Sequence, residues 1–133
     1  MLLEDNIKDV LIIDDDEDVI QVLEMYCEDL EVFRLIVKAN NGLEAASKLA
    51  NQKFHLILMD VNMPKKTGVE IVSEFSRFKM NSLSNVVLIS GELDRKMIEQ
   101  TMKYGVKNYL VKPFDEATFK AKVMPILKSK NNK

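Results

Sequence analysis

The chain contains little of several residue types that would mark it as a particular kind of protein. Among its 133 residues are one cysteine, three prolines, four glycines and no tryptophan. A single cysteine excludes an internal disulfide framework and suits a reducing compartment. No apolar run approaches the roughly 18 residues of a membrane-spanning helix, and no signal peptide is apparent. We therefore expect a cytoplasmic protein without membrane contact.

The charges also show no strong excess of one sign. Nineteen basic residues against 21 acidic ones give a formal net charge of -2, so we expect no direct binding of nucleic acid. The length predicts a single domain covering 1–133, large enough for a sizeable core. We place that core at about 8–128 and expect 129–133 to be a solvated polar tail.

Four short apolar runs each lead directly into polar residues. Apolar runs of about four to eight residues, separated by helical stretches, are typical of strands in a parallel sheet covered on both faces. The carboxyl ends of such strands lie along one edge, where ligands bind, so we expect the polar residues to meet there. The runs are Val10–Ile13 before Asp14, Asp15 and Asp16, Leu56–Met59 before Asp60, Val86–Ile89 before Ser90, and Tyr109–Val111 before Lys112.

Between these runs, apolar residues recur at helical spacing. The expected helices are 17–30, a stretch after Asn41-Gly42, 69–78, 95–104 and a segment from about 115, and the other expected strand is 33–37. Right-handed crossovers then predict an α/β three-layer sandwich, a five-stranded parallel sheet with five helices. The pattern does not determine the strand order. The flavodoxin-like order 2-1-3-4-5 is favoured because it brings Asp15 beside Asp60.

Pro125 falls inside the last expected helix. Proline lacks an N–H group and its ring clashes with the preceding turn, so we expect this helix to kink or end near Val123. The sequence suggests no function for Pro125.

The residues after the strands have a common chemistry. Clustered carboxylates need a cation between them, and a neighbouring lysine needs an anion. Taken singly, each residue also has an ordinary interpretation: Asp16 as a charge in the first turn of a helix, Asp60 as a turn residue, Lys112 as a surface residue. Four strand ends carrying such groups together favour a site for a divalent metal and a phosphoryl group.

The sequence also contains an ordered set of short motifs. With these motifs, and with the separations between them, the segment from about Lys8 to Lys128 resembles the response-regulator receiver domain of two-component signalling. The motifs are Asp14-Asp15, Leu58-Met59-Asp60, Met63-Pro64 followed by Gly68, Ser90-Gly91, and Tyr109-Leu110-Val111-Lys112-Pro113-Phe114.

The resemblance implies a role for each site residue. Asp60 would be the phosphoacceptor, taking a phosphoryl group from a histidine kinase or a histidine phosphotransfer protein. Asp15, Asp60 and the backbone carbonyl of Asn62 would hold Mg²⁺, with Asp14 acting largely through water and Mn²⁺ able to substitute. Lys112 would supply positive charge to a phosphoryl oxygen.

Ser90 and Tyr109 resemble the switch pair of that family. The Ser90 hydroxyl would donate to the attached phosphoryl group, and the Tyr109 ring would move into the space that this vacates. The resemblance implies a signalling phosphoacceptor that catalyses only its own phosphorylation and dephosphorylation. The downstream partner is not identifiable from the sequence.

Two stretches depart from the family pattern. Lys65-Lys66-Thr67 replaces the frequent Gly-Met-Asp and adds two positive charges near the phosphorylation loop. Lys107-Asn108 stands where many DNA-binding members carry two acids that join ion pairs across a dimer, so we do not expect that dimer.

Three other functions are compatible with parts of the pattern. A Mg²⁺-dependent aspartyl phosphatase of the haloacid dehalogenase type wants a second aspartate where Asn62 stands. A flavin carrier needs a phosphate-binding loop after the first strand, where Asp14, Asp15 and Asp16 would repel phosphate. A phosphorylation-independent docking domain would have no use for the complete acid, hydroxyl and lysine set.

Overall fold

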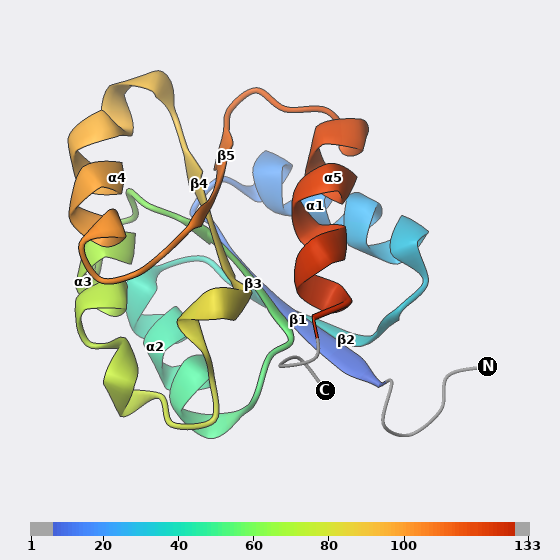
Figure 1. Ribbon diagram of the computed structural model, residues 1–133, viewed down its shortest axis with the longest axis horizontal. Helices are drawn as coiled ribbons and strands as arrows, with labels where there is room; N and C mark the ends of the chain where they lie inside the picture. Colours follow the sequence, from blue (N-terminus) through green and yellow to red (C-terminus); the bar gives the residue numbers. More distant parts are fainter. Residues whose placement is uncertain (1–6, 130–133) are drawn as a thin grey trace.

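The computed structural model of the chain describes residues 7–129. Residues 1–6 and most of the predicted polar tail, 130–133, therefore lie outside the described part. Strands and helices alternate along the chain (Figure 1). The elements are β1 (Lys8–Ile13), α1 (Glu17–Leu30), β2 (Phe33–Ala39), α2 (Gly42–Asn51), β3 (Leu56–Asp60), α3 (Gly68–Ser73), β4 (Val86–Ser90), α4 (Arg95–Met102), β5 (Asn108–Val111) and α5 (Glu116–Leu127).

All five strands form one parallel sheet in the order β2-β1-β3-β4-β5. This confirms the predicted flavodoxin-like order. The register pairs Ile13 with Met59 and Asp60 with Ile89, so β1, β3 and β4 end at nearly the same level. The residues that follow these strands therefore lie at one edge of the sheet.

The helices cover both faces of the sheet, as predicted for a three-layer sandwich. In Figure 1, α2, α3 and α4 lie on one side of the strands, and α1 and α5 lie on the other. Alternate strand residues feed two separate cores: Leu11 and Ile13 pack with the α2–α4 layer, whereas Val10 and Ile12 pack with α1 and α5. Burial of apolar side chains on both faces explains why the strands are continuous apolar runs.

Side-chain caps determine where several helices begin. Asp16, Asn41, Thr67 and Asp115 each precede a helix in extended backbone and accept a hydrogen bond from a backbone N–H in its first turn. Such caps satisfy N–H groups that have no partner within the helix. The ordinary reading of Asp16 as a helix-start residue is thus confirmed.

Two predicted helices differ from the structure. The helix expected over 69–78 ends at Ser73 and is followed by a 3₁₀ turn, Phe75–Arg77. We expected α5 to kink or end near Val123; the end is wrong, because α5 continues through Pro125 to Leu127. Pro125 lies in the last turn, where its missing N–H removes one hydrogen bond. The buried side chains of Ile126 and Leu127 hold that turn against the core.

Within the described part of the chain, 7–129, every helix is too short or too polar to cross a lipid bilayer.

Candidate functional site

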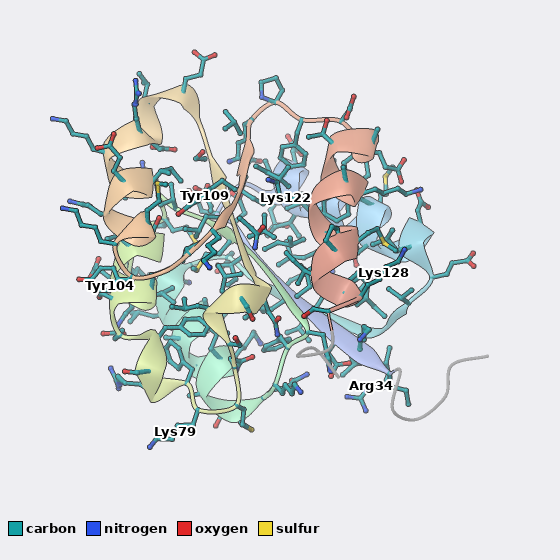
Figure 2. The ribbon with its side chains drawn as sticks, in the orientation of Figure 1. Arg34, Lys79, Tyr104, Tyr109, Lys122 and Lys128 are labelled. Atoms are coloured by element: carbon teal, nitrogen blue, oxygen red, sulfur yellow. The ribbon has the colours of Figure 1, made fainter. Side chains whose placement is uncertain are left out.

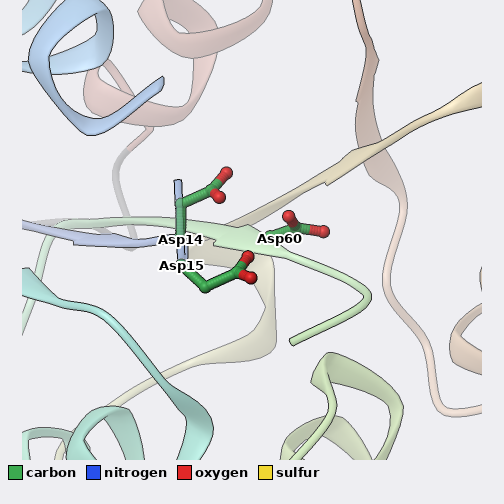
Figure 3. Close-up of side chains that lie close together, drawn as sticks. All are labelled: Asp14, Asp15 and Asp60. Atoms are coloured by element: carbon green, nitrogen blue, oxygen red, sulfur yellow. The ribbon is translucent and has the colours of Figure 1, made fainter. Parts of the chain in front are cut away.

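Three aspartates meet at the carboxyl edge of the sheet. Asp14 and Asp15 follow β1, and Asp60 is the last residue of β3. One carboxylate oxygen from each lies within 4.8 Å of the others (Figure 3). Asp14 and Asp60 are buried and Asp15 is exposed, so the cluster opens to solvent on one side.

Lys112 is the cation of this cluster. Its Nζ lies 3.2 Å from Asp60 Oδ2 and 3.4 Å from Asp14 Oδ2. The backbone N–H of Lys112 donates to the carbonyl oxygen of Ser90 at 2.7 Å, which fixes the start of the β5–α5 loop against the end of β4. The structure therefore brings together four residues that the sequence separates by up to 98 positions, from Asp14 to Lys112.

The two buried carboxylates differ in how they are satisfied. Asp60 Oδ1 accepts a hydrogen bond from the backbone N–H of Asn62 at 2.9 Å, and Asp60 Oδ2 accepts one from Lys112. Asp14 Oδ1 accepts from the N–H of Asp16 at 2.9 Å. Asp14 Oδ2 has no hydrogen-bond partner among residues 7–129 and forms an ion pair with the Lys112 ammonium.

This arrangement perturbs the ionisation of the cluster. Burial, reinforced by the negative charge of Asp60, raises the pKa of Asp14 to about 6. Burial also acts to lower the pKa of Lys112, but the charges of Asp60 and Asp14 outweigh it, and the pKa of Lys112 lies above its ordinary value. The cluster thus holds more negative charge than a single lysine compensates.

The donor set suits a hard divalent cation. Three carboxylates offer oxygen ligands, and one buried oxygen, Asp14 Oδ2, has no hydrogen-bond donor within the described residues. Mg²⁺ prefers oxygen ligands and is commonly bound by one or two carboxylates together with waters and phosphate oxygens. The residues present fit Mg²⁺, as the sequence predicted.

A glycine holds the loop after Asp60 close to the strand end. The N–H of Gly68 donates to the carbonyl oxygen of Val61 at 2.9 Å. A Cβ atom at position 68 would lie 2.8 Å from the Val61 Cα and 2.9 Å from the Asp60 carbonyl oxygen, so no residue with a side chain fits at this position. A capping box between Thr67 and Glu70 then fixes the start of α3.

Ser90 and Tyr109, the predicted switch pair, lie on the neighbouring strands β4 and β5. Ser90 is buried at the end of β4, with 3% of the residue exposed. Tyr109 is half-buried between β5 and α4 (Figure 2). Its hydroxyl donates to the Val106 carbonyl oxygen at 2.8 Å and lies 3.3 Å from Thr101 Oγ1. The ring is therefore anchored to the end of α4.

An apolar groove of about 450 Å³ runs beside this pair, between α4 and β5. Its walls include Ser90, Gly91, Ile98, Met102, Tyr109 and Val111. This groove was not predictable from the sequence, because Met102 and Val111 fit the patterns of an ordinary helix and strand, although both are more than half exposed.

A second polar cluster lies at the opposite, amino edge of the sheet. Buried Asp9 accepts two hydrogen bonds from the Arg34 guanidinium, at 3.1 and 2.7 Å, and one from Gln52 at 3.1 Å. His55 Nδ1 accepts from the N–H of Asp9 at 3.1 Å. These contacts tie β1 to β2 and to the loop before β3, at the end of the sheet remote from the three aspartates.

Comparison with known proteins identifies the family. The profile described as "Response regulator receiver domain" matches residues 10–124. The chain is 30% identical over 122 residues to the chemotaxis protein CheY-3 of Vibrio cholerae, covering 92% of each. It is 33% identical over 110 residues to the transcriptional regulatory protein MalR of Bacillus subtilis, covering 83% of this chain and 46% of MalR. The chain belongs to the response regulator receiver domain family.

Solved structures support the same fold. The receiver domain of the sensor histidine kinase PA1611 from Pseudomonas aeruginosa, described with a magnesium ion in its active-site cleft, superposes with a TM-score of 0.77 at 20% identity, covering 92% of this chain and 98% of that one. The chemotaxis response regulator CheY4 of Vibrio cholerae gives a TM-score of 0.75 at 26% identity, covering 90% and 98%. The chain spans about half the length of most of the transcriptional regulators that it matches.

Proposed function

We propose that this receiver domain accepts a phosphoryl group on Asp60 and changes partner binding in response. The donor is a phosphohistidine on a histidine kinase or a histidine phosphotransfer protein. One observation carries the proposal: Asp60 ends the central strand with Lys112 Nζ 3.2 Å away and with the Asp14 and Asp15 carboxylates around it. This combination provides a nucleophile, a cation for a phosphoryl oxygen and a place for a metal.

The transfer exchanges one bond to phosphorus for another. A carboxylate oxygen of Asp60 attacks the phosphorus atom, the bond from phosphorus to the histidine nitrogen breaks, and an acyl phosphate forms. The Asn62 N–H holds Oδ1 of Asp60 and so orients the carboxylate. Lys112 neutralises part of the phosphoryl charge. Positioning and charge neutralisation supply most of the catalysis in phosphoryl transfer.

We propose Mg²⁺ as the metal, held by Asp15, Asp60 and the backbone carbonyl of Asn62, with Asp14 acting through water. When bound, Mg²⁺ offsets the repulsion between a phosphoryl group and the acidic cluster. Substitution by Mn²⁺ stays a prediction. The orphaned oxygen of buried Asp14 supports a cation at this place.

The switch that we propose uses Ser90 and Tyr109. The Ser90 hydroxyl donates to the acyl phosphate and draws the end of β4 toward it. The Tyr109 hydroxyl then leaves Val106 and Thr101, and the ring turns toward the space that Ser90 has vacated. The 450 Å³ groove between α4 and β5 changes shape as a result, because both residues line it.

A second groove, of about 280 Å³, supports docking of the donor beside the site. Val19 and Val22 of α1 and Pro113 and Phe114 of the β5–α5 loop line it, together with Lys112. An apolar surface that ends at the phosphoryl-binding lysine suits a helix that carries a phosphohistidine.

We also propose that the domain acts in the cytoplasm and signals without binding nucleic acid directly. Cys27 remains a free, buried thiol, which suits the cytoplasm. We predict that this domain does not itself bind nucleic acid. Relatives such as MalR are named as transcriptional regulatory proteins, so this stays a prediction. The domain is a signalling phosphoacceptor that catalyses only its own phosphorylation and dephosphorylation.

Incubation with radiolabelled acetyl phosphate and Mg²⁺ tests the proposal. We expect label on the wild-type chain, none on Asp60→Asn, and undiminished label on the matched control Asp29→Asn, which alters an exposed residue of α1. Labelling of Asp60→Asn, or equal labelling with EDTA in place of Mg²⁺, would contradict the assignment. A wild-type chain that takes up no label would favour the phosphorylation-independent docking domain.

A further inference from the structure

The first helical residue of α2 is a glycine that the helix itself does not require. Gly42 follows the cap residue Asn41, whose side chain accepts from the N–H of Glu44 at 2.9 Å. Gly42 is buried, and its φ is outside the left-handed region that favours glycine. Alanine would favour the helix here by up to about 1 kcal/mol. The reason for glycine must therefore lie in its surroundings.

Those surroundings are the loop between β3 and α3. A Cβ atom at position 42 would lie 1.8 Å from the Lys66 carbonyl oxygen and 2.5 Å from the Lys66 Cβ atom. The N–H of Gly42 also points at the carbonyl oxygen of Pro64, at 3.5 Å. Real Cβ atoms essentially never approach other heavy atoms closer than 3.0 Å. An alanine would push this part of the loop back by about 1 Å or more.

The loop is short and is held at its far end, so it cannot absorb such a push locally. Lys66 forms an ion pair with Glu74 at the end of α3. Gly68 packs directly on the Asp60 and Val61 backbone. We therefore expect the displacement to be transmitted along the loop backbone to Asn62. The Asn62 N–H donates a hydrogen bond to Asp60 Oδ1 at 2.9 Å.

We propose that Gly42 is a positioning residue of the phosphoacceptor site, acting through the β3–α3 loop. The inference rests on the proposed function of Asp60. The absence of a side chain at position 42 lets Lys66 pack against the start of α2, and this contact sets the position of the Asn62 backbone. The Asn62 N–H then orients Asp60, and the Asn62 carbonyl is the proposed metal ligand on the same backbone.

The size of the effect follows from the displacement. A misplacement of about 1 Å can cost about a hundredfold in rate when reacting groups must be aligned. We expect Gly42→Ala to lower the initial rate of Asp60 phosphorylation by about tenfold to a hundredfold. Mg²⁺ affinity should fall in the same variant, because Asp60 and the Asn62 carbonyl move together.

The test compares Gly42→Ala with wild type and with Leu43→Ala, a matched control at the next residue, whose side chain is 56% exposed. Three quantities are measured: the amide chemical shift of Asn62 in metal-free protein, the Mg²⁺ dissociation constant by NMR titration, and the initial rate with acetyl phosphate. Urea unfolding is followed in parallel. We expect Gly42→Ala alone to move all three quantities while the domain stays folded.

A second background tests the route through Lys66. Lys66→Gly removes one of the two clashing groups, the Cβ atom, and lets the backbone turn the carbonyl aside. The rate effect of Gly42→Ala should therefore shrink by about threefold or more in Lys66→Gly, as expected for coupled neighbours. Equal effects of Gly42→Ala in both backgrounds would overturn the proposal.

Other outcomes separate this inference from the proposed function. An unchanged Asn62 shift and rate in Gly42→Ala would overturn the role of Gly42 and leave Asp60 as acceptor. Loss of the folded state in Gly42→Ala would also overturn it, because Gly42 would then serve the fold rather than the site. Absence of labelling in the wild type, with Asp60→Asn as reference, would contradict the proposed function itself.

Discussion

Replacing Asp14 by asparagine should make the metal-free domain more stable. Asp14 is fully buried, and its Oδ2 has no hydrogen-bond donor within residues 7–129. Burial and the nearby charge of Asp60 make its ionised form costly in the folded state. Asparagine keeps an oxygen to accept the hydrogen bond from the Asp16 N–H, now 2.9 Å, and removes the charge.

The magnitude and its pH dependence follow from the pKa of Asp14, which rises from 3.8 to about 6 on folding. A tenfold change in an acid constant corresponds to about 1.36 kcal/mol, so the cost has a ceiling of about 3 kcal/mol. Solvent screening at the open side of the cluster reduces the expected gain to about 1–2 kcal/mol.

The sign follows from proton binding. Because the folded chain has the higher pKa, it binds more protons than the unfolded chain between about pH 4 and pH 6, and the cost of ionised Asp14 grows across this range. The advantage of Asp14→Asn should therefore be complete above about pH 6 and vanish below about pH 4.

Urea unfolding in EDTA at several pH values between 4 and 8 measures this difference, and a second series with Mg²⁺ completes it. Mg²⁺ should stabilise the wild type more than Asp14→Asn, because only the wild type keeps the full negative charge. A metal-free Asp14→Asn that is less stable than wild type at pH 7.5 would contradict this expectation. A stability difference between the two proteins that does not change with pH would contradict it as well.

Two further perturbations separate the switch from the scaffold. Ser90→Ala should leave the affinity for Mg²⁺ unchanged. Beryllofluoride, a mimic of the acyl phosphate, should no longer shift the amide signals of Tyr109 and α4 in this variant. Shifts equal to those of wild type would contradict the proposed switch. Asp9→Ala removes the acceptor of three hydrogen bonds from Arg34 and Gln52, at the remote edge of the sheet. It should lower the free energy of unfolding by about 1–2 kcal/mol, with an unchanged phosphorylation rate; a slower rate would show that the two edges are coupled.

The strands were predictable because burial on both faces leaves continuous apolar runs in the sequence. The runs ending at Ile13, Met59 and Ile89 are continuous apolar stretches, and the acids after the first two of them favoured β1 beside β3. The 2-1-3-4-5 order thus followed from chemistry rather than from any strand pattern, and the sheet confirms it.

The region after Asp60 was harder, because helical and 3₁₀ turns bury apolar residues at similar spacing. Phe75 and Phe78, three positions apart, suit the three-residue period of a 3₁₀ turn, and their rings stack edge to face with centroids 5.4 Å apart. Pro125 misled in the opposite direction, because a proline in a last turn costs only one hydrogen bond. The contact of Gly42 with Lys66 joins residues 24 positions apart and leaves no local signal.

The place of β3 in the sheet bears on how a signal can leave this domain. β3 is the central strand, with hydrogen-bonded neighbours on both sides and helices above and below, so the backbone that carries Asp60 is held from every side. Only one strand, β4, separates it from the margin at β5. We therefore expect the effect of phosphorylation to reach that margin through β4. A partner that responds to phosphorylation should contact β5 rather than Asp60.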